Sequence, residues 1–136
     1  MLPTNQRPKS LHEVAERATS LEAWGAALSD FLDEINFRRG ADISLGPCVQ
    51  PVPKLLRAKF SGGEIADAFS AAVAEYFATE SLGGTAPAWT RQPERFLDIP
   101  WYPDDSPQIR AYLDRVAPRE FREHGVFIDI DSLARV

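Results

Sequence analysis

The residues of this chain best suited to bind another molecule are the aromatic and basic side chains between Pro87 and Pro103. This segment, called the strap below, holds four prolines, two of the chain's three tryptophans and no glycine. Each proline fixes one backbone angle, and tryptophan, tyrosine and arginine dominate the binding energy of protein interfaces. The sequence therefore predicts a candidate partner-binding set, which consists of Trp89, Arg91, Arg95, Trp101 and Tyr102.

The strap also has a purely structural interpretation. Large aromatic side chains are usually buried, so Trp89, Phe96, Trp101 and Tyr102 would lock a non-helical segment across two long helices. The two interpretations are compatible, because each can hold for different side chains.

A thiol and two imidazoles are the candidates for nucleophilic chemistry. Cys48 lies in a proline-containing loop, and a catalytic thiol needs an imidazole or a cation to form thiolate. The two histidines, His12 and His124, lie in no recognisable motif. We therefore expect Cys48 to fill space in the core, with a small enzyme as the alternative. A single cysteine also excludes an internal disulfide.

Carboxylates recur at helical spacing in two places, and such faces can bind a hard cation. Solvated helix faces have the same pattern, and metal sites usually recruit histidine or loop carbonyls. We therefore predict no metal and no cofactor. The alternative hypothesis is a small enzyme or a metal-binding protein that uses Cys48, the histidines or these carboxylates. The carboxylates concerned are Asp30, Asp33 and Glu34, expected to face water, and Glu64, Asp67 and Glu75.

The densest basic stretch suggests a third function, a DNA-binding regulator. It contains Arg110, Arg115, Arg119 and Arg122, and it forms a stripe only if a helix continues through Pro118. The chain as a whole has 20 acidic and 15 basic residues and a net charge of −5. Because this charge repels phosphate backbones, direct binding to nucleic acid is disfavoured.

Helical spacing of apolar residues and capping residues predict the elements that position these side chains. We expect a loose tail over residues 1–9 and helices that begin after Ser10 and Ser20, the second ending near Arg38–Gly40. A long connection follows, with one helical turn at Lys54–Ala58. The next helix starts after Gly63 and stops at Leu82–Gly84.

The second half of the chain is predicted to hold shorter elements. Thr90 would cap a turn at Pro93–Phe96, and Ser106 would cap a helix with a buried stripe. Pro118 opens a further short helix that closes at His124–Gly125, residues 126–130 are β-prone, and a last turn carries Leu133. The buried stripe consists of Ile109, Tyr112, Leu113 and Val116.

The sequence thus predicts a mainly α fold: one compact helical domain over residues 10–136, with the strap and at most one short β segment near the C-terminus. Its 136 residues are 44% hydrophobic and 26% charged, values typical of globular chains. No segment approaches the about 20 apolar residues of a membrane span, and no signal peptide is recognisable. A reducing, cytoplasmic location fits the single cysteine.

Four stretches carry a resemblance to known proteins: Trp24–Ile35, Ala72–Tyr76, Pro87–Trp101 and Pro118–Asp129. With them the chain resembles a group of short uncharacterised proteins of actinobacterial type, from GC-rich bacteria. Members of this group look like neighbours of nucleotidyltransferase-fold proteins, which implies a toxin–antitoxin module with this chain as its antitoxin-like member. The resemblance implies no catalytic residues.

The leading functional hypothesis is a non-enzymatic protein-interaction module. An acidic protein is steered toward a basic cleft and can block it, which suggests a nucleotidyltransferase-like partner. A homo-oligomer is compatible with the same residues.

Overall fold

The computed structural model describes residues 3–81 and 83–133. Within these ranges the chain forms six α-helices and four short 3-10 turns, with no β-strand, which confirms the mainly α prediction. Met1, Leu2, Leu82 and residues 134–136, which the predictions included, lie outside this description. No described helix is long and apolar enough to cross a lipid bilayer.

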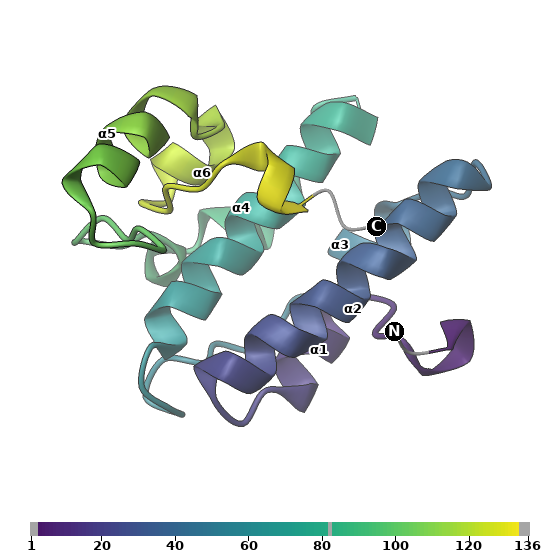
Figure 1. Cartoon of the computed structure of the whole chain (residues 1–136). Coiled ribbons are helices and arrows are strands. Elements are labelled where there is room, and N and C mark those ends of the chain that lie inside the picture. Colours follow the sequence, from purple (N-terminus) through teal and green to yellow (C-terminus); the bar gives the residue numbers. More distant parts are fainter. Residues whose placement is uncertain (1–2, 82, 134–136) are drawn as a thin grey trace.

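Two long helices form the framework of the domain. Helix α2 (Leu21–Gly40) and helix α4 (Gly63–Ser81) lie alongside each other, and the short helix α1 (Leu11–Arg17) packs on α2 (Figure 1). Their inward faces supply most of the apolar core. The remaining elements therefore attach to the outside of this framework.

Serine caps set the beginnings of three helices, as predicted. The hydroxyl of Ser10 accepts a hydrogen bond from the Glu13 amide at 3.1 Å, and that of Ser20 accepts one from the Ala23 amide at 3.0 Å. Ser106 caps helix α5 (Pro107–Val116). Each cap satisfies an amide that the helix itself leaves without a partner.

The connection between α2 and α4 differs from its prediction. The helical turn is helix α3 (Gly46–Val49), and not Lys54–Ala58. Pro47 lies in the first turn of α3, where its missing N–H costs nothing. Helix α4 then starts against this connection, since a Cβ on Gly63 would lie 2.0 Å from the carbonyl oxygen of Leu56.

The first half of the strap contains two 3-10 turns, η2 (Ala88–Arg91) and η3 (Pro93–Arg95). The predicted cap at Thr90 is wrong, because Thr90 lies inside η2. Its hydroxyl donates to the carbonyl oxygen of Pro87 at 2.9 Å. A threonine hydroxyl bonded back to its own turn is not available to cap the next one.

The N-terminal segment packs on α2, so the expected tail contacts the helices before Ser10. After the turn η1 (Thr4–Gln6), Arg7 is 6% exposed, and it faces Glu34, which is 3% exposed. One oxygen of Glu34 accepts from Arg7 and Lys9, both at 3.1 Å, and the other accepts from Arg38 at 2.9 Å. Glu34 was expected to face water, and that prediction is wrong, because three cations allow its burial.

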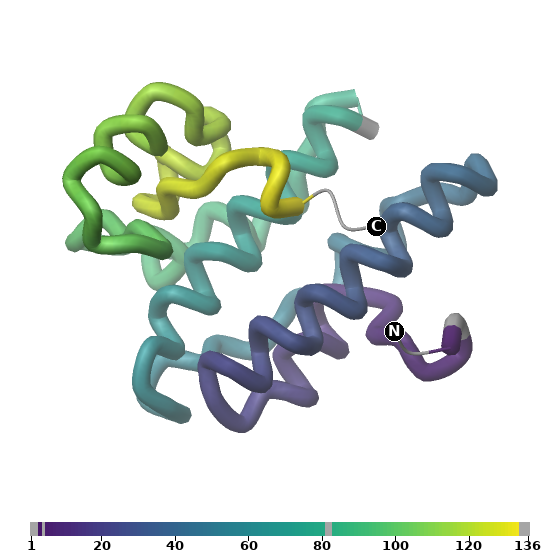
Figure 2. The backbone as a smooth tube through the Cα atoms, viewed as in Figure 1, coloured from purple at the N-terminus to yellow at the C-terminus, as the bar shows by residue number. Residues whose placement is uncertain are grey.

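The C-terminal part pairs with the strap through its backbone. After helix α6 (Arg119–Glu123), the amide of Trp101 donates to the Gly125 carbonyl at 2.8 Å, and the amide of Phe127 donates to the Trp101 carbonyl at 3.0 Å. This is an isolated parallel bridge, and not a strand. Figure 2 shows this segment crossing α4 toward α2, where it ends in the turn η4 (Ile130–Leu133).

Replacing Glu34 by glutamine tests the N-terminal contact. The variant keeps the shape of the side chain but removes the charge that three cations share, so we expect the free energy of unfolding at pH 7 to fall by about 2 kcal/mol. Burial alone would raise the pKa of Glu34, but hydrogen bonds from Arg38, Lys9 and Arg7 hold it below its usual 4.5. The stabilisation by the charged form is therefore complete above pH 4.5 and is lost as the pH falls through the folded-state pKa.

Urea unfolding at pH 7 and about pH 3 measures this effect. The difference between wild type and Glu34→Gln should shrink at the lower pH. Glu16→Gln is the control, because the Glu16–Lys54 ion pair is half exposed and contributes little. If the Arg7–Glu34 contact does not stabilise the fold, wild type and Glu34→Gln should have equal free energies of unfolding at each of the two pH values.

Candidate interaction surface

Two of the five predicted partner-binding residues are buried. Trp89 is 5% exposed, and its indole N–H donates to the Val49 carbonyl at 2.9 Å. Arg95 is 1% exposed, and its guanidinium carbon lies 4.8 Å from the centre of the Trp89 ring. The prediction that these two side chains contact a partner is therefore corrected, because both are buried in the domain. The structural interpretation of the strap expects this for Trp89 but not for Arg95.

The charge of Arg95 is matched by groups from two other segments. Its Nη2 donates to the Pro53 carbonyl at 2.6 Å, and its Nη1 lies 3.8 Å from Asp67 of α4. Asp67 also accepts from the amides of Leu56 and Arg57. Burial raises the pKa of Asp67 and lowers that of Arg95. Asp67 therefore holds the loop and the strap on α4, and offers no free ligand for a cation.

A second buried network ties α6 to α4. Glu75 lies 2.8 Å from Nε2 of His124, whose Nδ1 donates to the Arg95 carbonyl at 2.7 Å. The His124 ring also stacks on Phe96. Arg91, 58% exposed, donates to the other oxygen of Glu75 at 3.0 Å. Burial alone would raise the pKa of Glu75, but the bonds from His124 and Arg91 hold it below its usual value. The network positions the strap.

Cys48 and the histidines do not form a nucleophilic site. Cys48 is fully buried, and this burial raises the pKa of its thiol to about 11, so thiolate is scarce near neutral pH. His12 lies on the surface and contacts the Val52 carbonyl, and the contacts of His124 are those given above. Across residues 3–81 and 83–133, no three His, Cys, Asp or Glu side chains gather as a metal site would require.

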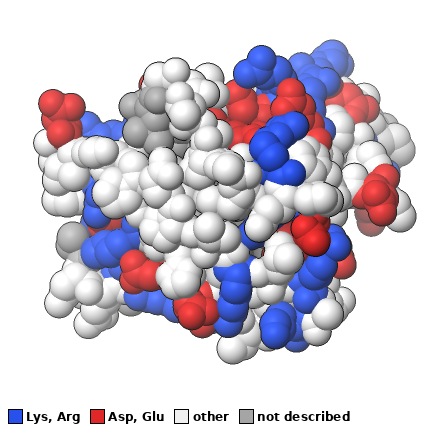
Figure 3. All heavy atoms as spheres, turned by 180° about the vertical axis from the view of Figure 1, so that it is seen from behind, with Lys and Arg blue, Asp and Glu red and all other residues white. Residues whose placement is uncertain are grey.

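The arginine stretch does not form one stripe, because Ala117 and Pro118 separate α5 from α6. Arg110 pairs with Asp105 at 3.1 Å, and Arg122 donates to the Ala117 carbonyl. Seen from behind, the molecule has charges of both signs around an uncharged centre (Figure 3). This face shows none of the single-signed field that binds a phosphate backbone.

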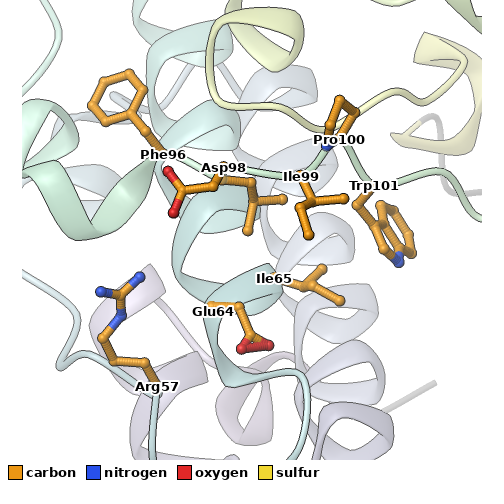
Figure 4. A pocket seen from close by; sticks show the side chains of 9 residues that line it. Arg57, Glu64, Ile65, Phe96, Asp98, Ile99, Pro100 and Trp101 are labelled. Carbon is orange, nitrogen blue, oxygen red and sulfur yellow. The ribbon is translucent and has the colours of Figure 1, made fainter.

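The exposed half of the strap borders a first cavity of about 420 Å³, called the strap cavity. Ile99 is 80% exposed and lies opposite Ile65 on the first turns of α4, with Trp101 at one end and Arg57 at the other (Figure 4). The other lining residues are Glu64, Phe96, Leu97, Asp98 and Pro100.

A second cavity of the same volume, called the helix cleft, is also lined by Trp101. Three groups of residues line it. Helix α2 contributes Gly25, Leu28, Ser29 and Leu32; α5 contributes Ile109, Tyr112 and Leu113; and Phe69, Trp101, Pro103, Ile128, Asp129, Ser132 and Leu133 complete it. Most of these side chains are apolar. Trp101 is half-buried, contacts Phe69 edge to face, and lines both cavities.

The predicted buried stripe of α5 is wrong in three of its four positions. Leu113 is buried, whereas Ile109 and Tyr112 are each 41% exposed and Val116 is 37% exposed. Ile109, Tyr112 and Leu113 line the helix cleft, where no element of the described chain covers the exposed side chains of Ile109 and Tyr112. An apolar stripe indicates only that a face needs an apolar neighbour, and does not show that the chain itself supplies one.

Gly25 is a signal for the cleft that the sequence analysis missed. A glycine inside a helix costs roughly 1 kcal/mol relative to alanine. Neither packing nor the backbone requires it here, since a Cβ would meet nothing within 4 Å and the φ angle is not positive. Its effect in the structure is to keep the α2 wall of the cleft flat.

The predicted set thus divides in two: Trp89 and Arg95 are internal, whereas Arg91, Trp101 and Tyr102 reach the surface. Comparisons with protein-family models, with curated proteins and with solved structures found no match. The function is therefore argued from the geometry of the site itself.

We expect Cys48 to be unreactive in the folded protein. At about pH 8 a thiol-specific reagent such as DTNB should label it at least about a hundredfold more slowly than in the urea-unfolded chain, where the thiol recovers its ordinary pKa near 8.5. Fast stoichiometric labelling of the native protein would contradict the burial of Cys48 and revive the thiol as a nucleophile.

Fluorescence quenching by acrylamide tests the placement of the three tryptophans. Trp24 and Trp89 are each 5% exposed, and Trp101 is the partly exposed one. Most of the quenchable emission should therefore disappear in Trp101→Phe, whereas Trp24→Phe, the control, should leave it. Equal quenching of all single variants would show that the strap is not seated as described.

Proposed function

We propose that this protein is a non-enzymatic protein-interaction module, and that its partner docks on the surface centred on Trp101. The observation that carries the proposal is that the half-buried Trp101 lines two cavities, each of about 420 Å³. Tryptophan is one of the residue types enriched in interface hot spots.

The exposed apolar side chains support a protein partner. Ile99, Ile109 and Tyr112 are three of the seven exposed large apolar residues of the described chain, and each lines one of the two cavities. Gathered apolar exposure with a polar rim is typical of interaction sites. The prolines and the backbone pairing of Trp101 hold this surface in one conformation, which lowers the entropy cost of binding.

The charge of the chain and the resemblance of its motifs support a choice of first partner. A net charge of −5 favours association with a basic protein and accelerates the encounter. The resemblance implies a nucleotidyltransferase-like protein encoded beside this one, so an antitoxin-like role is part of the proposal. No contact or cavity described above favours the enzyme, metal-binding or DNA-binding alternatives.

Co-expression with the product of the neighbouring gene, followed by size-exclusion chromatography at micromolar concentration, tests the proposal. We expect co-elution with the wild-type chain. Trp101→Ala and Ile99→Asp should each weaken the complex by about tenfold or more, equivalent to about 1.4 kcal/mol, since they remove or charge the centre of the surface.

Val52→Asp is the matched control, because Val52 is an exposed apolar residue that lines neither cavity. It should leave co-elution unchanged. Independent elution of the two wild-type proteins would reject this partner, and equal loss of binding in all three variants would reject the surface.

A further inference from the structure

The helix cleft admits a more specific inference, which rests on the proposed function. We propose that the cleft seats an amphipathic helix of the partner protein, with apolar residues on one face and a lysine or arginine next to Asp129. Three features of the cleft lead to this occupant.

The first feature is the shape of the walls. Gly25, Ser29 and Leu32 recur along α2 at offsets 0, 4 and 7, and Ile109, Tyr112 and Leu113 recur along α5 at offsets 0, 3 and 4. Each wall is thus the face of a helix. Helices pack by fitting the ridges of one into the grooves of another, and a helix that lays its apolar face between these walls would bury the exposed half of the α5 stripe.

The second feature is the flatness of the α2 wall. With glycine at 25 and serine at 29, this wall has two small side chains one turn apart. The open space beside Gly25 is available to an occupant, because a Cβ there touches nothing within 4 Å. Small side chains let a second backbone approach closely, and here they lie opposite large exposed ones on α5.

The third feature is a carboxylate, the only charged side chain among the residues that line the cleft in the described chain. Asp129 accepts from the Tyr112 hydroxyl at 2.5 Å and from the Asp131 amide at 3.0 Å. These bonds hold the pKa of Asp129 below its usual value, so it is charged at neutral pH. Arg115 lies over the Tyr112 ring at 5.9 Å, but among the described residues no cation forms an ion pair with Asp129. A cationic residue of the occupant would complete this site.

An extended peptide fits the cleft less well than a helix. Peptides that bind as strands need the free edge of a sheet, and the described chain contains only an isolated bridge. A small apolar ligand is usually enclosed over most of its surface, whereas this cleft is open to solvent. An extended peptide is one outcome of the experiment below, which would then enrich sequences without helical spacing.

The experiment selects peptides from a displayed library of sequences about 15 residues long, roughly four helical turns, against the full chain. We expect the enriched peptides to carry apolar residues at offsets 0, 3 or 4, and 7, with lysine or arginine near one end. Gly25→Phe, which fills the cleft, should weaken their binding by at least about tenfold. Gly25→Ala is the matched control and should leave binding within about threefold of wild type.

Asp129→Asn tests the charge. It should weaken basic peptides by about tenfold at low salt, and this difference should shrink in high salt because screening weakens charge pairs. Thermal melts of each variant show whether it folds. If Gly25→Phe does not fold, the binding of the selected peptides to Asp129→Asn alone tests whether the cleft is their site.

The inference is overturned if no peptide is enriched, if the enriched peptides are acidic or lack helical spacing, or if Gly25→Phe or Asp129→Asn binds as well as wild type. Its failure is distinct from that of the proposed function. A neighbour that co-elutes in a Trp101-dependent manner, with no selection of basic helices, would reject the inference alone. Selection of basic helices without co-elution would reject only the partner proposed above.

Discussion

The burial of one guanidinium organises this molecule. Arg95 is almost without solvent exposure, so each of its N–H groups needs a partner inside the protein. Those partners come from three separate parts of the chain: Gln92 in the strap, the Pro53 carbonyl in the loop and Asp67 on α4. The Trp89 ring covers the same group. An internal charge of this kind fixes position more than it adds stability, because its desolvation cost offsets much of the attraction.

The interaction surface follows from this constraint. Because Arg95 is held in place, its carbonyl accepts a hydrogen bond from His124, and the other ring nitrogen of His124 contacts the Glu75 carboxylate. These contacts set the position of the start of the C-terminal segment relative to α4. Gly125 then passes close to the strap at a φ of 82°, where a Cβ would lie 2.9 Å from that of Leu97. The two cavities beside Trp101 are the spaces that remain between elements held in this way. The buried polar contacts of Arg95, His124 and Glu75 thus determine the shape of the surface around Trp101.

Helices and caps that depend on neighbouring residues could be predicted from the sequence, whereas contacts between residues far apart in the chain could not. Helix α2 and its cap at Ser20 follow from apolar spacing and from a serine three residues before the amide that it bonds. The burial of Glu34 depends on Arg7, 27 residues earlier in the chain, and that of Arg95 depends on Pro53, 42 residues earlier. Spacing along a helix carries no information about such partners. For the same reason the α5 stripe revealed an apolar face, but not that the face would stay uncovered.

The position of Trp101 is fixed by main-chain atoms, since its amide and carbonyl bond to the backbone of Gly125 and Phe127. Main-chain hydrogen bonds do not depend on which side chain a residue carries, except that proline lacks the N–H donor. A change of side chain at Phe127 therefore keeps this bond, although it removes the stack of the Phe127 ring on Tyr102, and proline is the one residue type that the bond forbids there. At Gly125 the residue type is restricted, because the positive φ and the nearby Leu97 leave no room for a Cβ. Of the two backbone partners of Trp101, one thus tolerates substitution and the other does not.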